Sequence, residues 1–216
     1  MKTDALLQKD VIAELDWEPS VNSAHIGVEV LDGIVTLAGH VKSYTEKWGA
    51  ERAAGRVLGV KGLAVEIDVA LPGSSKRNDV DIARSAENIL QWMSYLPKDY
   101  VKVMVEGGWL TLSGNVAWDY QREAAEAAVH HLLEVTGVSN QIVLRPRVSM
   151  SVLETDIETA LKRRAKVNAP SICVEIRGAD LILSGTVHSL PERDLARHSA
   201  WSTPGVRNVT NNIIVV

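Results

Sequence analysis

The stretch GGWLTLSGNV, residues 107–116, opens on a glycine pair and has three glycines within eight residues. Glycine-rich loops that hold phosphate groups follow a strand and lead into a helix. Here the glycine pair instead precedes an alternating segment that is typical of a strand. The stretch also occurs three times, because residues 32–41 (DGIVTLAGHV) and residues 178–187 (GADLILSGTV) match it after shifts of 75 and 71 positions. We therefore expect these glycines to shape the backbone of a repeated element.

The repeat extends in register, without gaps, over a unit of about 70 residues. A period of this kind indicates one structural unit that the chain has copied. The columns shared by all three copies include Gly39, Gly114 and Gly185; Val41, Val116 and Val187; Ala50, Ala125 and Ala196; and Leu15, Leu90 and Leu161.

Each copy predicts the order helix, strand, strand, helix, strand. In the first copy, Leu7, Val11 and Leu15 recur at helical spacing, and residues 26–30 alternate as in a half-buried strand. Asp32-Gly33 is a hairpin signal, and the last strand follows a second helix, as parallel pairing requires. We therefore expect an α+β fold of three tandem αββαβ units, each a mixed three-stranded sheet with two helices packed on one face.

Two short polar segments separate the copies. LPGSSKRND, residues 71–79, has the composition of a flexible linker, and RPRVS, residues 145–149, is shorter. The expected units are residues 1–71, 79–146 and 149–216.

The motif in the three copies is VTLAGHVKSYTEK (residues 35–47), LTLSGNVAWDYQR (residues 110–122) and LILSGTVHSLPER (residues 181–193). This pattern resembles the BON domain, which is named for bacterial osmotic-stress and nodulation proteins. The second copy departs from the pattern in having Glu134 where the others have glycine. The resemblance implies a non-catalytic module of envelope and stress proteins that often binds phospholipid surfaces, and many such proteins are exported to the periplasm.

Composition limits the classes of partner and the compartment. The formal net charge of −4 argues against a nucleic-acid partner. The absence of an 18-residue apolar run predicts no membrane-spanning helix. Residues 1–15 lack the pattern of a secretory signal, which predicts a cytoplasmic location, whereas the family resemblance favours the periplasm.

The polar residues show no pattern of a catalytic or metal site. His130 and His131 are adjacent and cannot both face one ion from a helix, and His188 and His198 have no acidic or cysteine cluster near them in the sequence. Cys173, the only cysteine, falls on a predicted strand. The sequence therefore predicts no enzyme, no cofactor and no metal site, with the histidines at the surface or beside helix ends.

The six tryptophans fall into two groups. Trp17 and Trp92 share a column and are expected to cover the core at the end of the first helix, and Trp201 is also expected to pack. The others interrupt columns that are polar or outward-facing, which favours either an exposed surface for lipid or protein or packing between units. These candidate binding residues are Trp48, Trp109 and Trp118, with Tyr120 beside the last.

Charge differs between the units, at −4 for residues 1–71, −2 for 72–146 and +2 for 147–216. Part of the excess comes from KRRAK, residues 162–166, at the end of a predicted helix, where cations favour the helix dipole and also suit anionic headgroups. The basic candidate residues are therefore Lys162, Arg163, Arg164 and Lys166.

The function expected from the sequence is a non-catalytic binding module of the bacterial envelope and osmotic-stress response. Its expected partner is an anionic phospholipid surface or an envelope protein. One alternative is self-assembly into an oligomer through open sheet edges, which could influence the passage of small molecules at the envelope. Another is a small-ligand or ion-binding stress sensor, to which outward acidic residues such as Glu29, Glu66 and Glu175 lend weak support.

Overall fold

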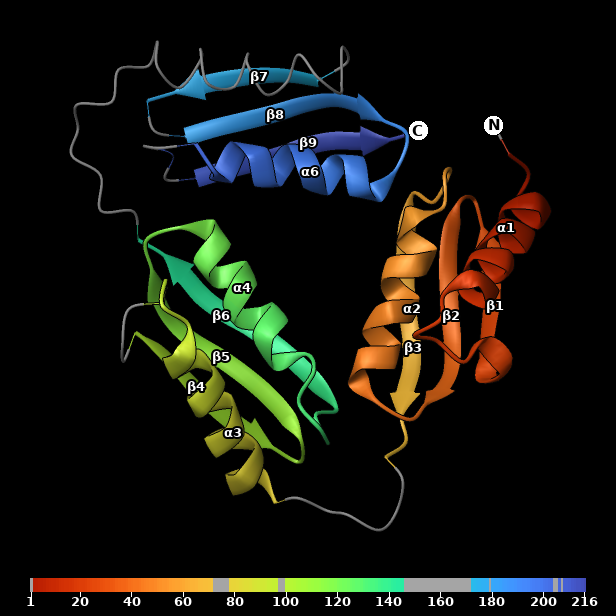
Figure 1. Ribbon diagram of the computed structural model, residues 1–216. Coiled ribbons are helices and arrows are strands. Elements are labelled where there is room, and N and C mark those ends of the chain that lie inside the picture. Colours follow the sequence, from red (N-terminus) through yellow and green to blue (C-terminus); the bar gives the residue numbers. More distant parts are fainter. Residues whose placement is uncertain are drawn as a thin grey trace.

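Three separate three-stranded sheets, one in each copy of the repeat, organise the fold (Figure 1). The computed structural model describes residues 2–71, 78–96, 100–145, 172–178, 180–203, 206 and 208–216. The first helix predicted for the third copy lies outside these residues, so the description of that unit begins at its first strand.

The described elements follow the predicted order in every unit. The first unit holds α1 (Asp4–Trp17), the 3-10 turn η1 (Ser23–His25), β1 (Ile26–Leu31), β2 (Ile34–Val41), α2 (Tyr44–Arg56) and β3 (Gly62–Val69). The second holds α3 (Asp79–Trp92), β4 (Val101–Glu106), β5 (Trp109–Val116), α4 (Asp119–Val129) and β6 (Gly137–Leu144). The third holds β7 (Ile172–Arg177), β8 (Asp180–Val187), α6 (Leu190–Trp201) and β9 (Asn208–Val215).

Strand pairing is the same in the three units. The first two strands form an antiparallel hairpin, and the third pairs in parallel with the second after a helical crossover. In the first unit this register places Leu37 between Val28 and Val65. The mixed sheets predicted from the repeat are confirmed.

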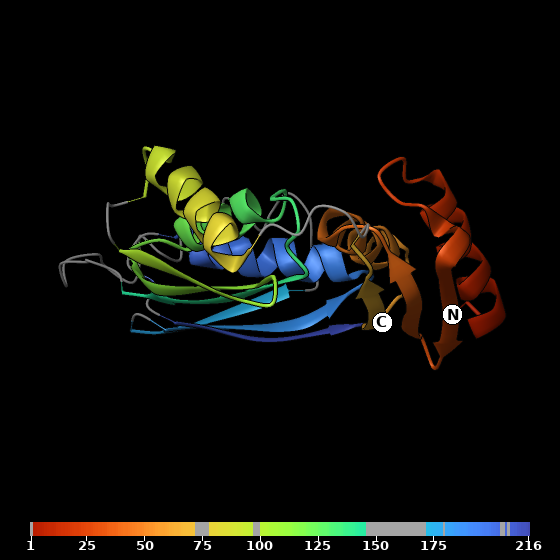
Figure 2. The same ribbon diagram turned by 90° about the horizontal axis from the view of Figure 1, so that it is seen from below.

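Helices cover one face of each sheet and leave the other face open (Figure 2). Val35 and Leu37 point into the first core, where the alanines of α2 let the helix approach the sheet closely. The second unit repeats this arrangement with Leu110, Leu112 and Ala125. The alternation in the sequence therefore identified the inward face of the middle strand.

The repeated glycine lies where the middle strand passes closest to the backbone before the first strand. Gly39, Gly114 and Gly185 have φ angles of 139°, 134° and 123°. A Cβ atom on Gly39 would lie 2.0 Å from the His25 carbonyl oxygen, and one on Gly114 would lie 2.0 Å from that of Tyr100. Only glycine fits both the conformation and the close approach.

The second helix of each unit has side-chain hydrogen bonds at its N-terminus. The Ser43 and Ser189 hydroxyls accept hydrogen bonds from the amides of Glu46 and Glu192. In the second unit Trp118 replaces the serine, and the Gln121 side chain accepts hydrogen bonds from the amides of Ala117 and Trp118. Capping therefore survives the loss of the serine.

The three units surround a centre toward which α2, α4 and α6 are turned (Figure 1). Tyr44, the first residue of α2, packs against the core of the second unit. Leu190, the first residue of α6, packs against the core of the first unit as well as its own. The two chain ends consequently lie near each other, one in the first unit and one in the third (Figure 1).

Candidate functional site

Trp48 lies at the contact between the first and second units. Its ring is 4.9 Å from that of His130, edge to face, and 6.2 Å from that of His131. The Arg52 guanidinium lies 4.6 Å from the centre of the indole. Of the two interpretations of this residue, the structure matches packing between units.

His130 is buried at this same contact. Its ring also meets Tyr44 edge to face at 5.4 Å, and its carbonyl accepts a hydrogen bond of 3.0 Å from the Thr45 hydroxyl. Its Nε2 lies 3.6 Å from Glu126 Oε1, and neither ring nitrogen makes a hydrogen bond. The sequence predicted a surface histidine beside a helix end; the helix end is correct, but the neighbouring unit covers it.

The carboxylates around His130 differ in their pKa values because their surroundings differ. Burial raises the pKa of Glu51, on α2, above the usual range. Interaction with the His130 ring lowers the pKa of Glu126, and a hydrogen bond from the Asn140 side chain adds to this. Burial also raises the pKa of the Tyr44 hydroxyl, with a further contribution from the charge of Glu51. The contact is thus a partly buried polar cluster.

A second cluster lies between α4 and α6, at the contact of the second and third units. His198 Nδ1 is 2.8 Å from Glu123 Oε2 and 4.0 Å from Asp119 Oδ2. Arg197 Nη2 is 3.4 Å from Glu123 Oε1. The sequence did not indicate this cluster, because the carboxylates of Asp119 and Glu123 lie on a helix of another unit, 75 residues or more from His198.

Trp201 packs against the third core, as predicted, and the Arg122 guanidinium lies 5.8 Å from its ring centre. This contact joins α6 to α4 and extends the cluster along the helices.

The remaining aromatic candidates are exposed. Trp109 is 50% exposed and lies across Gly137 of the adjacent strand, where an added Cβ would meet the indole at 2.3 Å. Trp118 and Tyr120 are also exposed, and the Tyr120 ring is 6.1 Å from that of Tyr95. These residues lie on different parts of the second unit, so the structure does not bring them together into one patch with Trp48.

Trp17 and Trp92 do not cover the core, contrary to the prediction. They are 83% and 89% exposed, the highest values among the described large hydrophobic side chains. The core is closed two residues earlier by Leu15 and Leu90, and two positions along an α-helix turn a side chain by about 200°. The shared column therefore marks a repeated surface feature.

Acidic residues surround Trp17. A surface hollow of about 590 Å³ is lined by Trp17, Glu14, Asp16, Glu18 and Arg56, with Pro19. Arg56 bridges Glu14 and Glu18, at 3.0 and 2.7 Å, and lowers the pKa of Glu18. The surroundings of this tryptophan are net negative.

The basic candidates Lys162, Arg163, Arg164 and Lys166 lie outside the described residues.

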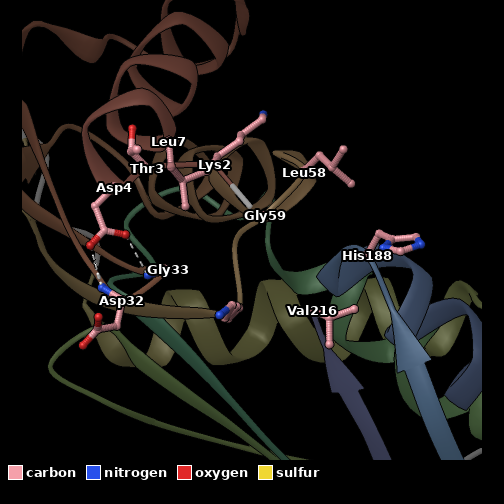
Figure 3. Close-up of a pocket in the computed structure, with 11 residues that line it drawn as sticks. Lys2, Thr3, Asp4, Leu7, Asp32, Gly33, Leu58, Gly59, His188 and Val216 are labelled. Atoms are coloured by element: carbon pink, nitrogen blue, oxygen red, sulfur yellow. Dashed lines mark hydrogen bonds between the residues drawn. The ribbon is translucent and has the colours of Figure 1, made fainter.

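A larger cavity, of about 730 Å³, lies where the first and third units meet near both chain ends (Figure 3). Asp4 lines it and accepts hydrogen bonds from the amides of Asp32 and Gly33, at 2.9 and 3.1 Å. His188 and Val216 line it from the third unit. The Asp4 carboxylate is therefore engaged in fixing the hairpin turn of the first unit.

None of the helices described here is long and apolar enough to cross a membrane.

Comparisons with known proteins agree with the repeated geometry. The family model of the BON domain matches three times, at residues 3–70, 78–146 and 149–216. The chain is 29% identical over 143 residues to osmotically-inducible protein Y of Escherichia coli (strain K12), covering 64% of this chain and 71% of that protein.

Two solved structures of CdsD, a structural protein of the type III secretion system of Chlamydia trachomatis, are similar at low level. The first is 14% identical with a TM-score of 0.27, covering 99% of this chain and 93% of that chain. The second, of the C-terminal domain, is 13% identical with a TM-score of 0.27, covering 100% of both chains. A likeness this weak carries no argument about the present chain.

Proposed function

This chain belongs to the BON domain family, and on that premise we propose that it is a non-catalytic module of the osmotic-stress response that attaches peripherally to phospholipid membranes of the cell envelope. Support for the stress role comes from the name of the relative, osmotically-inducible protein Y. Support for attachment to lipid comes from the surface of the molecule.

The carrying observation is the exposure of Trp17 and Trp92. They are the last residues of α1 and α3, and the C-terminal ends of these helices rise on the same, helical side of the molecule, at the top of Figure 2. Indole rings favour the boundary between headgroups and acyl chains. Two tryptophans on one side provide two points of insertion, one from each of the first two units.

In this proposal the third unit contacts the anionic headgroups, because its net charge is positive. The surroundings of Trp17 are acidic and do not attract anionic lipid. In the repeat, the column of Trp17 and Trp92 holds Arg163, within the basic run of residues 162–166. Each cation near an anionic surface contributes about 1 kcal/mol. Insertion by the first two units and electrostatic attraction by the third are therefore complementary.

Liposome co-sedimentation tests this proposal. The full chain is mixed at low salt with vesicles of zwitterionic lipid alone and with vesicles containing anionic lipid. We expect binding that increases with the content of anionic lipid. We expect the Trp17→Ala/Trp92→Ala variant to lose most of this binding on both vesicle types, because both points of insertion are removed.

Trp109→Ala is the matched control, since Trp109 is also exposed but lies on the open face of a sheet. It should bind as the wild type does. Equal binding by the double variant and the wild type, or no binding of the wild type at low salt, would contradict the proposal. Fractionation of cells, with and without osmotic stress, then assigns the envelope compartment.

Self-association is the second candidate function. In each described sheet the first and third strands are edges with no partner from another sheet, and the open faces carry exposed apolar side chains such as Ile34, Met104 and Ile214. Light scattering distinguishes the candidates, because an assembly that depends on sheet edges gives a mass above that of one chain without lipid.

A further inference from the structure

The contact between α4 and α6 gathers two carboxylates and one imidazole. Asp119 and Glu123 are four residues apart on α4 and therefore project from the same helix face. His198 faces them from α6, and one potential ligand atom from each of the three residues lies within 4.8 Å of the other two. The cluster exists only where the second and third units meet.

Asp119 gives the independent sign of a ligand. Its side chain is 1% exposed, and its Oδ2 accepts no hydrogen bond. The Arg122 guanidinium forms an ion pair with Oδ1, while Oδ2 faces His198 Nδ1 at 4.0 Å with no donor. Burying a carboxylate oxygen without a hydrogen bond destabilises the folded state. A cation bound at Oδ2 would remove this cost.

The repeat shows that folding does not require a carboxylate here. Asp119 shares its column with Tyr44 and Leu190, each the first residue of the second helix of its unit. Both place an apolar side chain against the core of a neighbouring unit. Only the second unit buries an acid at this position, and only there do Glu123 and His198 complete a cluster.

We propose that Asp119, Glu123 and His198 form a binding site for a divalent transition-metal cation of the zinc type, which links the second unit to the third. Carboxylate and imidazole donors suit zinc, and three protein ligands leave one coordination position for water or an added ligand. Ligand atoms on one zinc ion lie about 3.3 Å apart for bonds of about 2.0–2.1 Å. His198 Nδ1 is 2.8 Å from Glu123 Oε2 and 4.0 Å from Asp119 Oδ2, which are values on both sides of that distance. A small adjustment of the side-chain rotamers would therefore bring the three atoms to the distances that one zinc ion requires.

The neighbouring arginines and the types of donor atom together decide which metal ion the site binds. Arg197, 3.4 Å from Glu123, and Arg122, beside Asp119, already offset part of the negative charge. A cation must displace these pairs by forming stronger bonds. Magnesium and calcium need more oxygen ligands than the cluster offers, whereas zinc gains from the imidazole nitrogen. This inference does not depend on lipid binding.

Isothermal titration of the full, metal-free chain with zinc chloride tests the site, with magnesium chloride as the comparison ion. We expect one zinc ion per chain at this site and no comparable binding of magnesium. Asp119→Asn, Glu123→Gln and His198→Ala should each weaken zinc binding at least tenfold, because each removes one ligand. Zinc should also raise the midpoint of thermal unfolding of the wild type, but not that of Asp119→Asn.

The control variant is His40→Ala. His25 and His40 stack with ring centres 4.7 Å apart at the surface, and such a pair of imidazoles could bind zinc nonspecifically. His40→Ala should leave the proposed site unchanged, and circular dichroism should show every variant folded. Zinc affinity that survives Asp119→Asn and His198→Ala, or that disappears in His40→Ala, overturns the proposal, as does the absence of binding at millimolar zinc.

Discussion

At the scale of single residues, the repeated glycine is the most demanding position. Gly39→Ala places a Cβ 2.0 Å from the His25 carbonyl oxygen in a backbone with φ of 139°. We expect it to destabilise the first unit by about 3 kcal/mol or more. Urea unfolding followed by circular dichroism measures this.

Gly55→Ala is the matched control within the same unit. Gly55 lies in α2 with nothing within 4 Å of an added Cβ, so the substitution should stabilise the unit by about 0.5–1 kcal/mol through helix propensity. Equal stabilities of the two variants would show that the close approach at Gly39 relaxes at no cost.

Residues differ in how far the sequence reveals them. The glycine column was predictable because the constraint is local and recurs in each copy. The exposure of Trp17 and Trp92 was not, because their shared column was interpreted as a sign of core packing. Leu15 and Leu90 already occupy the inward face of these helices, and the tryptophans lie two residues later. Their angular position around the helix therefore predicts exposure.

At the scale of elements, one acidic residue at the start of the first helix of a unit accepts hydrogen bonds from the turn of that unit's hairpin. Asp79, the first residue of α3, accepts hydrogen bonds from the amides of Gly107 and Gly108, at 2.8 and 2.9 Å. Asp4 makes the equivalent pair of bonds in the first unit. The cap itself is Asn78, whose side chain accepts from the Asp81 amide. Two adjacent residues therefore have different roles: Asn78 caps the helix, and Asp79 binds the hairpin turn.

Asp79→Ala should destabilise the second unit by about 2 kcal/mol, because two charge-assisted hydrogen bonds are lost. Hydrogen exchange of the amides at residues 107 and 108 should quicken first, and urea unfolding gives the free energy. Asp81→Ala is the control: its carboxylate lies in the same turn but is 3.7 Å from its only described ion-pair partner, Arg84. A similar loss in both variants would assign the effect to the helix dipole alone.

At the scale of the whole molecule, the units meet head to tail. The first position of the second helix presents Tyr44 to the second unit and Leu190 to the first, and Asp119 faces His198 of the third. The start of the second helix of each unit therefore meets the next unit. The first unit contacts the second, the second contacts the third, and the third contacts the first. A head-to-tail interface that closes in this way forms a ring and leaves no free end for a filament.

The sequence did not reveal this ring, for a physical reason. The repeat identifies what the units share, but contacts between units use the columns in which the copies differ. One such column of the second helix holds Trp48, Glu123 and Asp194, and another holds Gly55, His130 and Trp201. Trp48 meets His130, and Glu123 meets His198. A column in which the three copies hold different residue types therefore indicated an interface between units. The sequence of one copy does not show which residue of the neighbouring unit lies opposite.

Acid should destabilise the protein at the His130 cluster, which lies where the first and second units meet. The folded state lowers the pKa of Glu126, mainly through His130 and with help from Arg122, so its stabilisation is complete above the unfolded pKa of 4.5 and is lost as pH falls through the lower, folded value. Tyr44 stays neutral throughout this range. Burial raises the pKa of Glu51, so this residue becomes neutral at a higher pH and its contribution to stability increases on acidification.

Stability measured from pH 6 to pH 3 should therefore fall more steeply for the wild type than for Glu126→Gln, which has no proton to gain at this position. The two curves should converge at the acid end, where the wild-type carboxylate is also neutral. Glu87→Gln serves as the control, since Glu87 is an exposed acid on α3, away from His130. Parallel curves for the wild type and Glu126→Gln would show that the pairing of Glu126 with His130 does not contribute to stability.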